Sequence, residues 1–262
     1  PLNNHCLYMT QKILFFLEKY LRMIERIKPK ETVISLIGPF SLMQTVKNQE
    51  DTLFLADKIY RKFFVQSVGV KVMWLIEKIR EKFPETTPII ILEEPLLHQY
   101  GDMKRLSEDI TKETVVNMYT KLFQKIHEHQ AAVGVQCFQK CDWQIIIESG
   151  ADLISFDAYN NPNNLNIIPE KINNFLAGGG YINWGIVPVM TESVIKSMTI
   201  DQVMNRFTHT IEGLITSGVS ERLAYNHALV SVQGNLNKFP IIFAEKALIT
   251  SCQLAKRIPM KH

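Results

Sequence analysis

The fold is decided by the stretch Pro88-Ile-Ile-Ile-Leu-Glu-Glu-Pro95, in which an apolar run ends in two adjacent carboxylates. Strands of parallel sheets are covered on both faces, so they are apolar throughout rather than alternating. Pro88–Leu92 has this character, and five further runs share it: Thr32–Gly38, Ala132–Cys137, Asp152–Asp157, Tyr181–Val187 and Ala228–Val232. The sequence therefore predicts six strands of the parallel type.

Amphipathic stretches fill the intervals between these runs. Thr199 and Gln202 form a capping box at the start of one helix, and Gly218 is placed to end it. We also expect a helix at Thr10–Ile27, a last helix at Pro240–Arg257, and two helices within Asp51–Phe83 that are separated near Gly69. Six alternations of strand and helix predict an α/β fold with a mainly parallel sheet.

Two closures of such a sheet compete. An open doubly wound sheet carries a glycine-rich phosphate turn after its first strand, but here that strand ends in Gly38-Pro39-Phe40. A TIM (β/α)8-type barrel has eight units in about 250 residues. The six units counted here favour a barrel of parallel strands that lacks its first one or two βα units, in a single domain over residues 1–262.

Composition excludes several classes of protein. The net charge is +3 and no basic block occurs, so we expect no nucleic-acid partner. No run of 18 uncharged apolar residues exists, so we expect no membrane span. The cysteines number only four in 262 residues, which favours a reducing compartment and a cytoplasmic location. Cys137 and Cys141 form a C-x3-C pair, two thiols where a zinc site needs three or four ligands.

Polar side chains gather at the carboxyl ends of the predicted strands, where α/β proteins hold their chemistry. Side chains alternate along a strand, so one of Glu93 and Glu94 points into the barrel mouth and the other toward the helices. A carboxylate in the mouth can bind an ammonium group or act as general acid or base. The competing interpretation is a structural pair bound to a backbone N–H or an arginine. Asp157 is similarly either a substrate anchor or metal ligand, or a cap for the following loop.

Aromatic residues outside the strands have simpler interpretations. We expect Phe15 and Phe16 of the first helix, and Trp74 of a later one, to lie in the core. Trp143 directly follows Asp142, which is placed to cap a helix.

Five of these segments, in order, resemble the superfamily that joins cobalamin-independent methionine synthase to uroporphyrinogen decarboxylase, and most of all its small methionine-synthase-like members. They are Leu36–Phe40, Ile91–Pro95, Asp142-Trp143, Asp152–Tyr159 and Ile182–Pro188, and the resemblance covers about residues 32 to 240. It implies a (β/α)8 barrel whose first strand would precede residue 1.

The resemblance also assigns roles. Glu93 matches an aspartate that holds the amino group of an amino-acid substrate, and Glu94-Pro95 match a Glu-Pro pair of the family. We expect Glu94 and Asp157 to be catalytic. The expected substrate-binding residues are Glu93, Gly38, Pro39, Tyr159, Trp184, Gln136 and Gln233.

The methionine synthase branch uses a zinc ion to hold homocysteine as a thiolate, which then takes a methyl group from a folate. Its His-x-Cys ligands fall here on Gln136 and Phe138, and a later cysteine falls on Gln233. Only the acidic ligand has a match, Asp157. Phenylalanine cannot bind a metal and glutamine is a poor zinc ligand, so we predict that the zinc site is lost and name no metal ligands.

The resemblance thus predicts a diverged methyltransferase-like barrel that acts on a small thiol or amino acid, with a folate or corrinoid as methyl donor. A corrinoid protein or a second copy of the chain is the partner that this implies. One alternative is a catalytically inactive member that binds a small ligand or a partner protein. Another is an enzyme of the porphyrin decarboxylase branch, whose key residues would precede Pro1.

Overall fold

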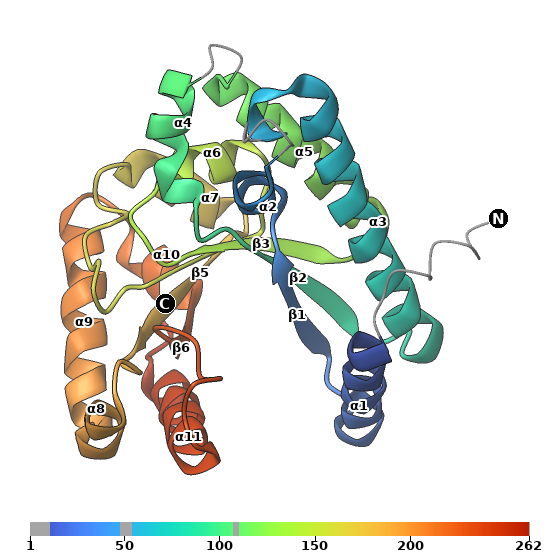
Figure 1. Ribbon diagram of the computed structural model, residues 1–262. Helices are drawn as coiled ribbons and strands as arrows, with labels where there is room; N and C mark the ends of the chain where they lie inside the picture. Colours follow the sequence, from blue (N-terminus) through green and yellow to red (C-terminus); the bar gives the residue numbers. More distant parts are fainter. Residues whose placement is uncertain (1–10, 48–53, 107–109, 262) are drawn as a thin grey trace.

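The computed structural model describes residues 11–47, 54–106 and 110–261 (Figure 1). Its centre is a six-stranded sheet in the order β1-β2-β3-β4-β5-β6, in which every neighbouring pair is parallel. The strands are β1 (Glu31–Ile37), β2 (Thr87–Glu93), β3 (Ala132–Cys137), β4 (Leu153–Phe156), β5 (Tyr181–Val187) and β6 (Ala228–Val232). The predicted α/β class and all six predicted strands are confirmed.

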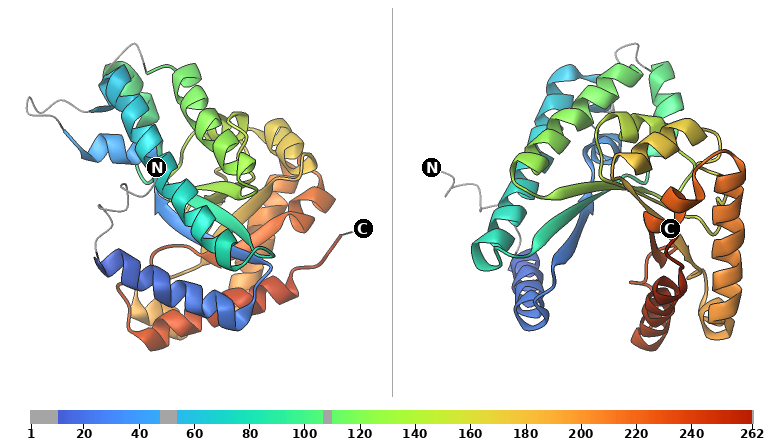
Figure 2. Two further views of the ribbon diagram at one scale, coloured as in Figure 1. Left: turned by 90° about the vertical axis from the view of Figure 1, so that its right-hand side faces the viewer. Right: turned by 180° about the vertical axis from the view of Figure 1, so that it is seen from behind.

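The sheet curves into an open half-barrel, with helices on its convex side (Figure 2). Within the described residues β1 and β6 are edge strands, so the closed eight-stranded ring is not formed by this part of the chain. The long helices are α1 (Gln11–Ile27), α3 (Lys58–Lys82), α5 (Lys112–Glu128), α9 (Ile200–Thr216) and α11 (Ile241–Arg257). The shorter α-helices are α2 (Pro39–Thr45), α4 (Tyr100–Leu106), α6 (Trp143–Glu148), α7 (Pro169–Ala177), α8 (Glu192–Ser197) and α10 (Glu221–Asn226).

Helix starts follow the caps expected from the sequence. The Thr199 hydroxyl accepts a hydrogen bond from Gln202 N while the Gln202 side chain accepts one from Thr199 N, which completes the predicted capping box of α9. Gly218 follows α9 with φ +115°, a conformation that favours glycine. Asp142 caps α6 by accepting from Gln144 N. These local signals needed no knowledge of the tertiary fold.

The predicted break near Gly69 is wrong, because α3 runs unbroken from Lys58 to Lys82. Gly69 is buried in the middle of this helix, where a Cβ would lie 3.4 Å from Leu122 Cδ1 of α5. The glycine therefore marks a close approach of two helices rather than a helix end.

The main core lies between the convex face of the sheet and its helices. Trp143, Phe156, Trp184 and Phe207 are fully buried there in a chain of ring contacts with centroids 5.4–6.4 Å apart. Phe15 and Phe16 are 52% and 58% exposed, so their predicted place in the core is wrong. The helix α1 packs through its opposite side instead, with Leu21 and Ile24 against Ile79 of α3.

None of the helices that the model describes is both long enough and apolar enough to cross a lipid bilayer.

Candidate functional site

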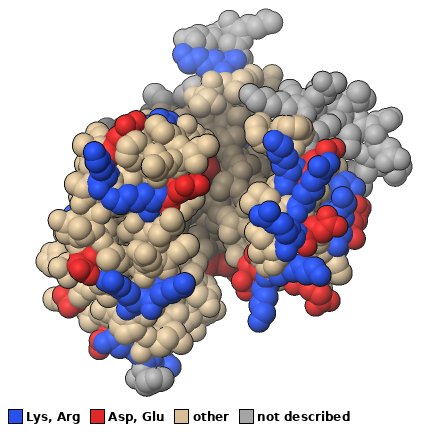
Figure 3. Space-filling model, turned by 90° about the horizontal axis from the view of Figure 1, so that it is seen from below, with Lys and Arg blue, Asp and Glu red and all other residues tan. Residues whose placement is uncertain are grey.

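The concave face of the sheet forms a hollow of about 790 Å³, which we call the concave cavity. Seen from below, this side of the molecule is a deep depression with mostly uncharged walls (Figure 3). Because side chains alternate along a strand, every second residue of each strand points into it. The strand residues that line the cavity are Val33, Ser35, Ile89, Ile91, Glu93, Gln136, Leu153, Ser155, Asn183, Leu229 and Ser231, with Ala228, Val230 and Val232 of the edge strand β6.

The lining divides into an apolar layer and a polar layer. Ile91 and Leu153 form the centre of the apolar layer, on either side of Gly134. A Cβ on Gly134 would lie 2.8 Å from Ile91 Cδ1 and 2.9 Å from Leu153 Cδ2, so a glycine is needed for these two side chains to meet. The polar layer lies two residues further along each strand, toward the carboxyl edge.

A connected row of polar side chains crosses this second layer. Glu93 is in register with Gln136, Gln136 with Ser155, and Ser155 with Asn183. Gln136 Nε2 donates to Ser155 Oγ over 3.3 Å. Asn183 Nδ2 donates to Ser155 Oγ over 2.8 Å and to Ser231 Oγ over 2.9 Å. Four neighbouring strands therefore present one fixed hydrogen-bonding surface.

Glu93 stands at one end of this row with an exposed side chain. Among the residues that line the cavity it is the only charged one, and the described chain gives its carboxylate no hydrogen-bond or ion-pair partner. A carboxylate accepts up to about four hydrogen bonds, and an ammonium group is the cation that matches it best at this scale. The cavity thus offers one negative anchor, several neutral hydrogen-bonding groups and an apolar wall.

Glu94, one residue further, points the opposite way and is 0% exposed. Its carboxylate accepts from Phe40 N over 3.0 Å, from Ser41 N over 2.7 Å and from the Tyr119 hydroxyl over 2.6 Å. Burial raises the pKa of Glu94, against the opposing effect of these hydrogen bonds. Burial and the adjacent Glu94 raise the pKa of Tyr119 well above its usual value. The alternation predicted for the two glutamates is confirmed.

Gly38, Pro39 and Glu94 form one structural unit. Gly38 is the N-cap of α2 and supplies no side-chain cap, while Pro39 occupies the first turn. The carboxylate of Glu94 takes over the cap by accepting the first free N–H groups of the helix. A Cβ on Gly38 would lie 2.1 Å from Glu94 Oε1, so the glycine makes room for the carboxylate. These three predicted site residues lie together, on the face of the sheet opposite to Glu93.

Asp157 lies just past β4 and is buried. Its Oδ1 accepts from Asn160 N over 2.9 Å, and its Oδ2 accepts from Asn160 Nδ2 over 2.6 Å. Both oxygens therefore organise the asparagine-rich loop that follows, the second interpretation given to this residue above. Its proposed catalytic role stays a prediction.

The remaining predicted residues are dispersed. Trp184 is 1% exposed between Phe156 and Phe207, on the helix-covered side of the sheet. Tyr159 packs against Arg206 of α9, whose Nη2 donates to the Tyr159 carbonyl over 2.6 Å. Gln233 Oε1 accepts a hydrogen bond from Val189 N over 3.0 Å, so the Gln233 side chain holds the loop after β5 in place. Of the nine predicted residues, Glu93 and Gln136 line the concave cavity.

The donor set at the positions that the resemblance assigns to zinc does not fit that ion. Those positions hold the amide of Gln136, the ring of Phe138 and an amide of Gln233 that already binds the backbone. In the described part of the chain no three His, Cys, Asp or Glu residues are grouped as metal ligands.

Cys137 and Cys141 lie together but are buried on the helix side. A hydrogen bond from the Cys141 thiol lowers the pKa of Cys137, and burial raises that of Cys141 well above normal.

Sequence reasoning missed Ser155, Asn183 and Ser231. Each is a polar residue inside an otherwise apolar strand, in Leu153–Phe156, Tyr181–Val187 and Ala228–Val232. Counting in steps of two from Glu93 along the register would have placed them on the inner face. The sequence contains this signal, but it lies within the strands and not in the loops that follow them.

Comparison with protein-family models and with curated proteins finds no match to this chain.

Proposed function

We propose that the six-stranded sheet is part of a methionine-synthase-like (β/α)8-type barrel, and that its concave cavity binds a small molecule carrying an ammonium group, of the amino-acid type. The observation that carries this proposal is the isolation of Glu93. Of the described residues that line this cavity of about 790 Å³, it is the single charged one, and none of them is basic.

The cavity has the right size and chemistry for such a ligand. Small-molecule sites of about 300–1,000 Å³ combine apolar walls with a few fixed polar groups. Ile91 and Leu153 supply apolar contact for a ligand side chain, and Glu93 supplies the counter-charge for its amine. Gln136 Nε2 gives one of its two N–H groups to Ser155 and can donate the other to a ligand carboxylate. Asn183 Nδ2 uses both of its N–H groups on Ser155 and Ser231, so its Oδ1 is the atom that can accept from a ligand hydroxyl or ammonium group.

Methyl transfer to a thiol, the reaction that the resemblance predicts, remains a prediction. A thiol acceptor needs a group that holds it as a thiolate, and the cavity lining that the model describes holds no cysteine, histidine, lysine or arginine. The binding of a small amine is therefore the function that these side chains support best.

The test is isothermal titration calorimetry of the protein with L-methionine, L-homocysteine and the 2-hydroxy analogue of methionine, which replaces the amine by a hydroxyl. We expect binding of the amines and at least about tenfold weaker binding of the hydroxy analogue, equal to 1.4 kcal/mol. The variant E93Q should bind all three ligands with the weak affinity of the hydroxy analogue.

The matched control is E170Q, which removes an exposed carboxylate of α7 that does not line the cavity. It should bind the amines as the unmodified protein does. Equal affinity for methionine and its hydroxy analogue, or unchanged binding by E93Q, would contradict the proposed role of Glu93.

A further inference from the structure

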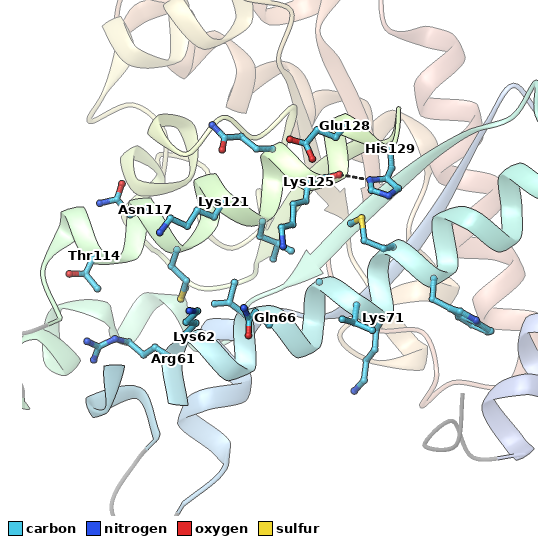
Figure 4. A pocket seen from close by; sticks show the side chains of 18 of the residues that line it. Arg61, Lys62, Gln66, Lys71, Thr114, Asn117, Lys121, Lys125, Glu128 and His129 are labelled. Carbon is cyan, nitrogen blue, oxygen red and sulfur yellow. Dashed lines mark hydrogen bonds between the residues drawn. The ribbon is translucent and has the colours of Figure 1, made fainter. Parts of the chain in front are cut away.

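A second hollow, larger than the concave cavity, lies on the outside of the molecule between α3 and α5. It measures about 1,160 Å³ and is lined by one stripe of each helix, between Lys58 and Glu77 on α3 and between Thr114 and Glu128 on α5, with His129 directly after α5. Figure 4 shows the two helices side by side with the polar residues of this groove. We call it the basic groove.

The floor of the basic groove is apolar. Val65, Val70, Met73 and Trp74 come from α3, and Met118 and Leu122 come from α5. Val70 is 48% exposed, and Trp74, which was expected in the core, is only half-buried here. Leu122 of α5 meets α3 at Gly69, so the two helices touch at the floor of the groove.

The rims of the groove are cationic. The lining holds five exposed lysines but only two glutamates, Glu77 and Glu128, while its one arginine, Arg61, is buried and donates to the Leu55 carbonyl. Lys62 on α3 and Lys121 and Lys125 on α5 are exposed, and the described chain gives their ammonium groups no acidic partner (Figure 4). The methylene stems of such lysines extend the apolar surface while their charged ends reach a ligand above it.

We infer that the basic groove binds an amphipathic α-helix of a partner protein, with its apolar face on the floor and acidic residues along both sides. Charge complementarity argues for the acidic character, and the apolar floor between two parallel rims matches a helix laid in a groove. The α3 stripe from Lys58 to Glu77 is about 28 Å long at 1.5 Å per residue, enough for a partner helix of about 18 residues.

An acidic helix explains the floor better than a nucleic acid does. Phosphate binding needs only cations, whereas the lining of this groove also includes the exposed Val70 and the half-buried Trp74. A lipid surface is flat and would contact a protruding helix face, whereas the apolar residues here lie in a hollow between two helices. The groove therefore fits a helix better than it fits a membrane surface.

The test uses an acetylated, amidated 18-residue peptide with leucines at i, i+3, i+4 and i+7 and glutamates beside them, labelled for fluorescence anisotropy. A second peptide carries glutamine in place of every glutamate. We expect the acidic peptide to bind at least about tenfold more tightly than the neutral one, and to bind less tightly as the salt concentration rises.

Tryptophan fluorescence locates the bound peptide. Trp143 and Trp184 are buried, so a blue shift of tryptophan emission on binding should come from Trp74 and vanish in W74F.

The charge reversal K121E/K125E should weaken the binding of the acidic peptide at least about tenfold. The control K30E/K256E reverses the charge of two exposed lysines outside the groove and changes the net charge by the same amount. Because neither lysine lines the groove, this variant should bind the acidic peptide with unchanged affinity. Equal binding of both peptides, full binding by K121E/K125E, or no binding at all would overturn the inference. Tighter binding of oligouridylate or of phosphatidylserine vesicles through the same lysines would overturn it too. E93Q should bind the peptide normally, which separates this surface from the concave cavity.

Discussion

The two faces of the sheet use neighbouring glutamates in opposite ways. On the helix-covered face, Glu94 is fully buried and accepts three hydrogen bonds from the protein itself. On the concave face, Glu93 is exposed, and its carboxylate has no hydrogen-bond or ion-pair partner in the part of the chain that is described. A buried carboxylate whose capacity is used within the protein serves stability, while a carboxylate left open in a cavity is available to a ligand.

The largest expected effect is on the helix-covered face. The variant E94A leaves two backbone N–H groups and the Tyr119 hydroxyl buried without an acceptor. We expect it to lower the free energy of unfolding by about 3–5 kcal/mol, measured by urea denaturation. E93A, one residue away, should change it by less than about 0.5 kcal/mol. Equal losses in both variants would erase the proposed difference between the faces.

The next effect concerns the glycine beside Glu94. In G38A the new methyl group would lie 2.1 Å from Glu94 Oε1, and the displacement should cost about 1–3 kcal/mol of unfolding free energy. The matched control is G101A, because a Cβ on Gly101 in α4 meets nothing within 4 Å. That variant should be neutral or more stable. A neutral G38A would show that the cap of α2 tolerates a shift of the carboxylate.

The pH dependence of stability should follow Glu94. Because burial raises its pKa above the usual 4.5, the folded state holds the proton more tightly than the unfolded state. The stability that protonation contributes is complete below pH 4.5 and is lost as the pH rises through the raised value. It amounts to about 1.4 kcal/mol for each pH unit between the two pKa values. The difference in unfolding free energy between the protein and E94Q should change in this way between about pH 4 and about pH 8, measured by urea denaturation.

If the difference between the protein and E94Q stays constant over that range, Glu94 has the same pKa in the folded and unfolded states. That result would contradict the raised pKa of the buried carboxyl group.

The smallest effect on stability is expected on the concave face. N183A removes the donor shared by Ser155 and Ser231 and should cost roughly 1 kcal/mol. Its effect on binding of an amino acid should be larger than its effect on unfolding, since the row of polar groups loses its centre. Titration calorimetry and urea denaturation of the same preparation compare the two. A variant that is much less stable but binds normally would place Asn183 among the structural residues.

Much of the fold could be predicted because its signals are local. Apolar runs gave the six strands, the Thr199–Gln202 box gave the start of α9, and alternation separated Glu93 from Glu94. Gly69 misled because the sequence alone does not show that Leu122 approaches it from another helix. The exposed Phe15 and Phe16 misled because burial depends on which side of α1 meets α3.

The candidate site was predictable only in part. Glu93 and Gln136 follow from the strand ends, but the partners of Glu94 lie more than 50 residues upstream at Phe40 and Ser41 and 25 residues downstream at Tyr119. Its structural role therefore depends on contacts that only the fold creates. Asn183 and Ser155 needed the register between strands, which fixes their shared row.

The most direct test of the concave cavity is an NMR titration of the isotope-labelled protein with L-methionine, following the side-chain amide signals of Gln136 and Asn183. These two groups belong to the polar row beside Glu93. We predict that both signals shift in proportion to the bound fraction, and that E93Q needs at least about tenfold more methionine for the same shifts. Signals that stay in place while the ligand binds, or shifts confined to α3 and α5, would contradict the account.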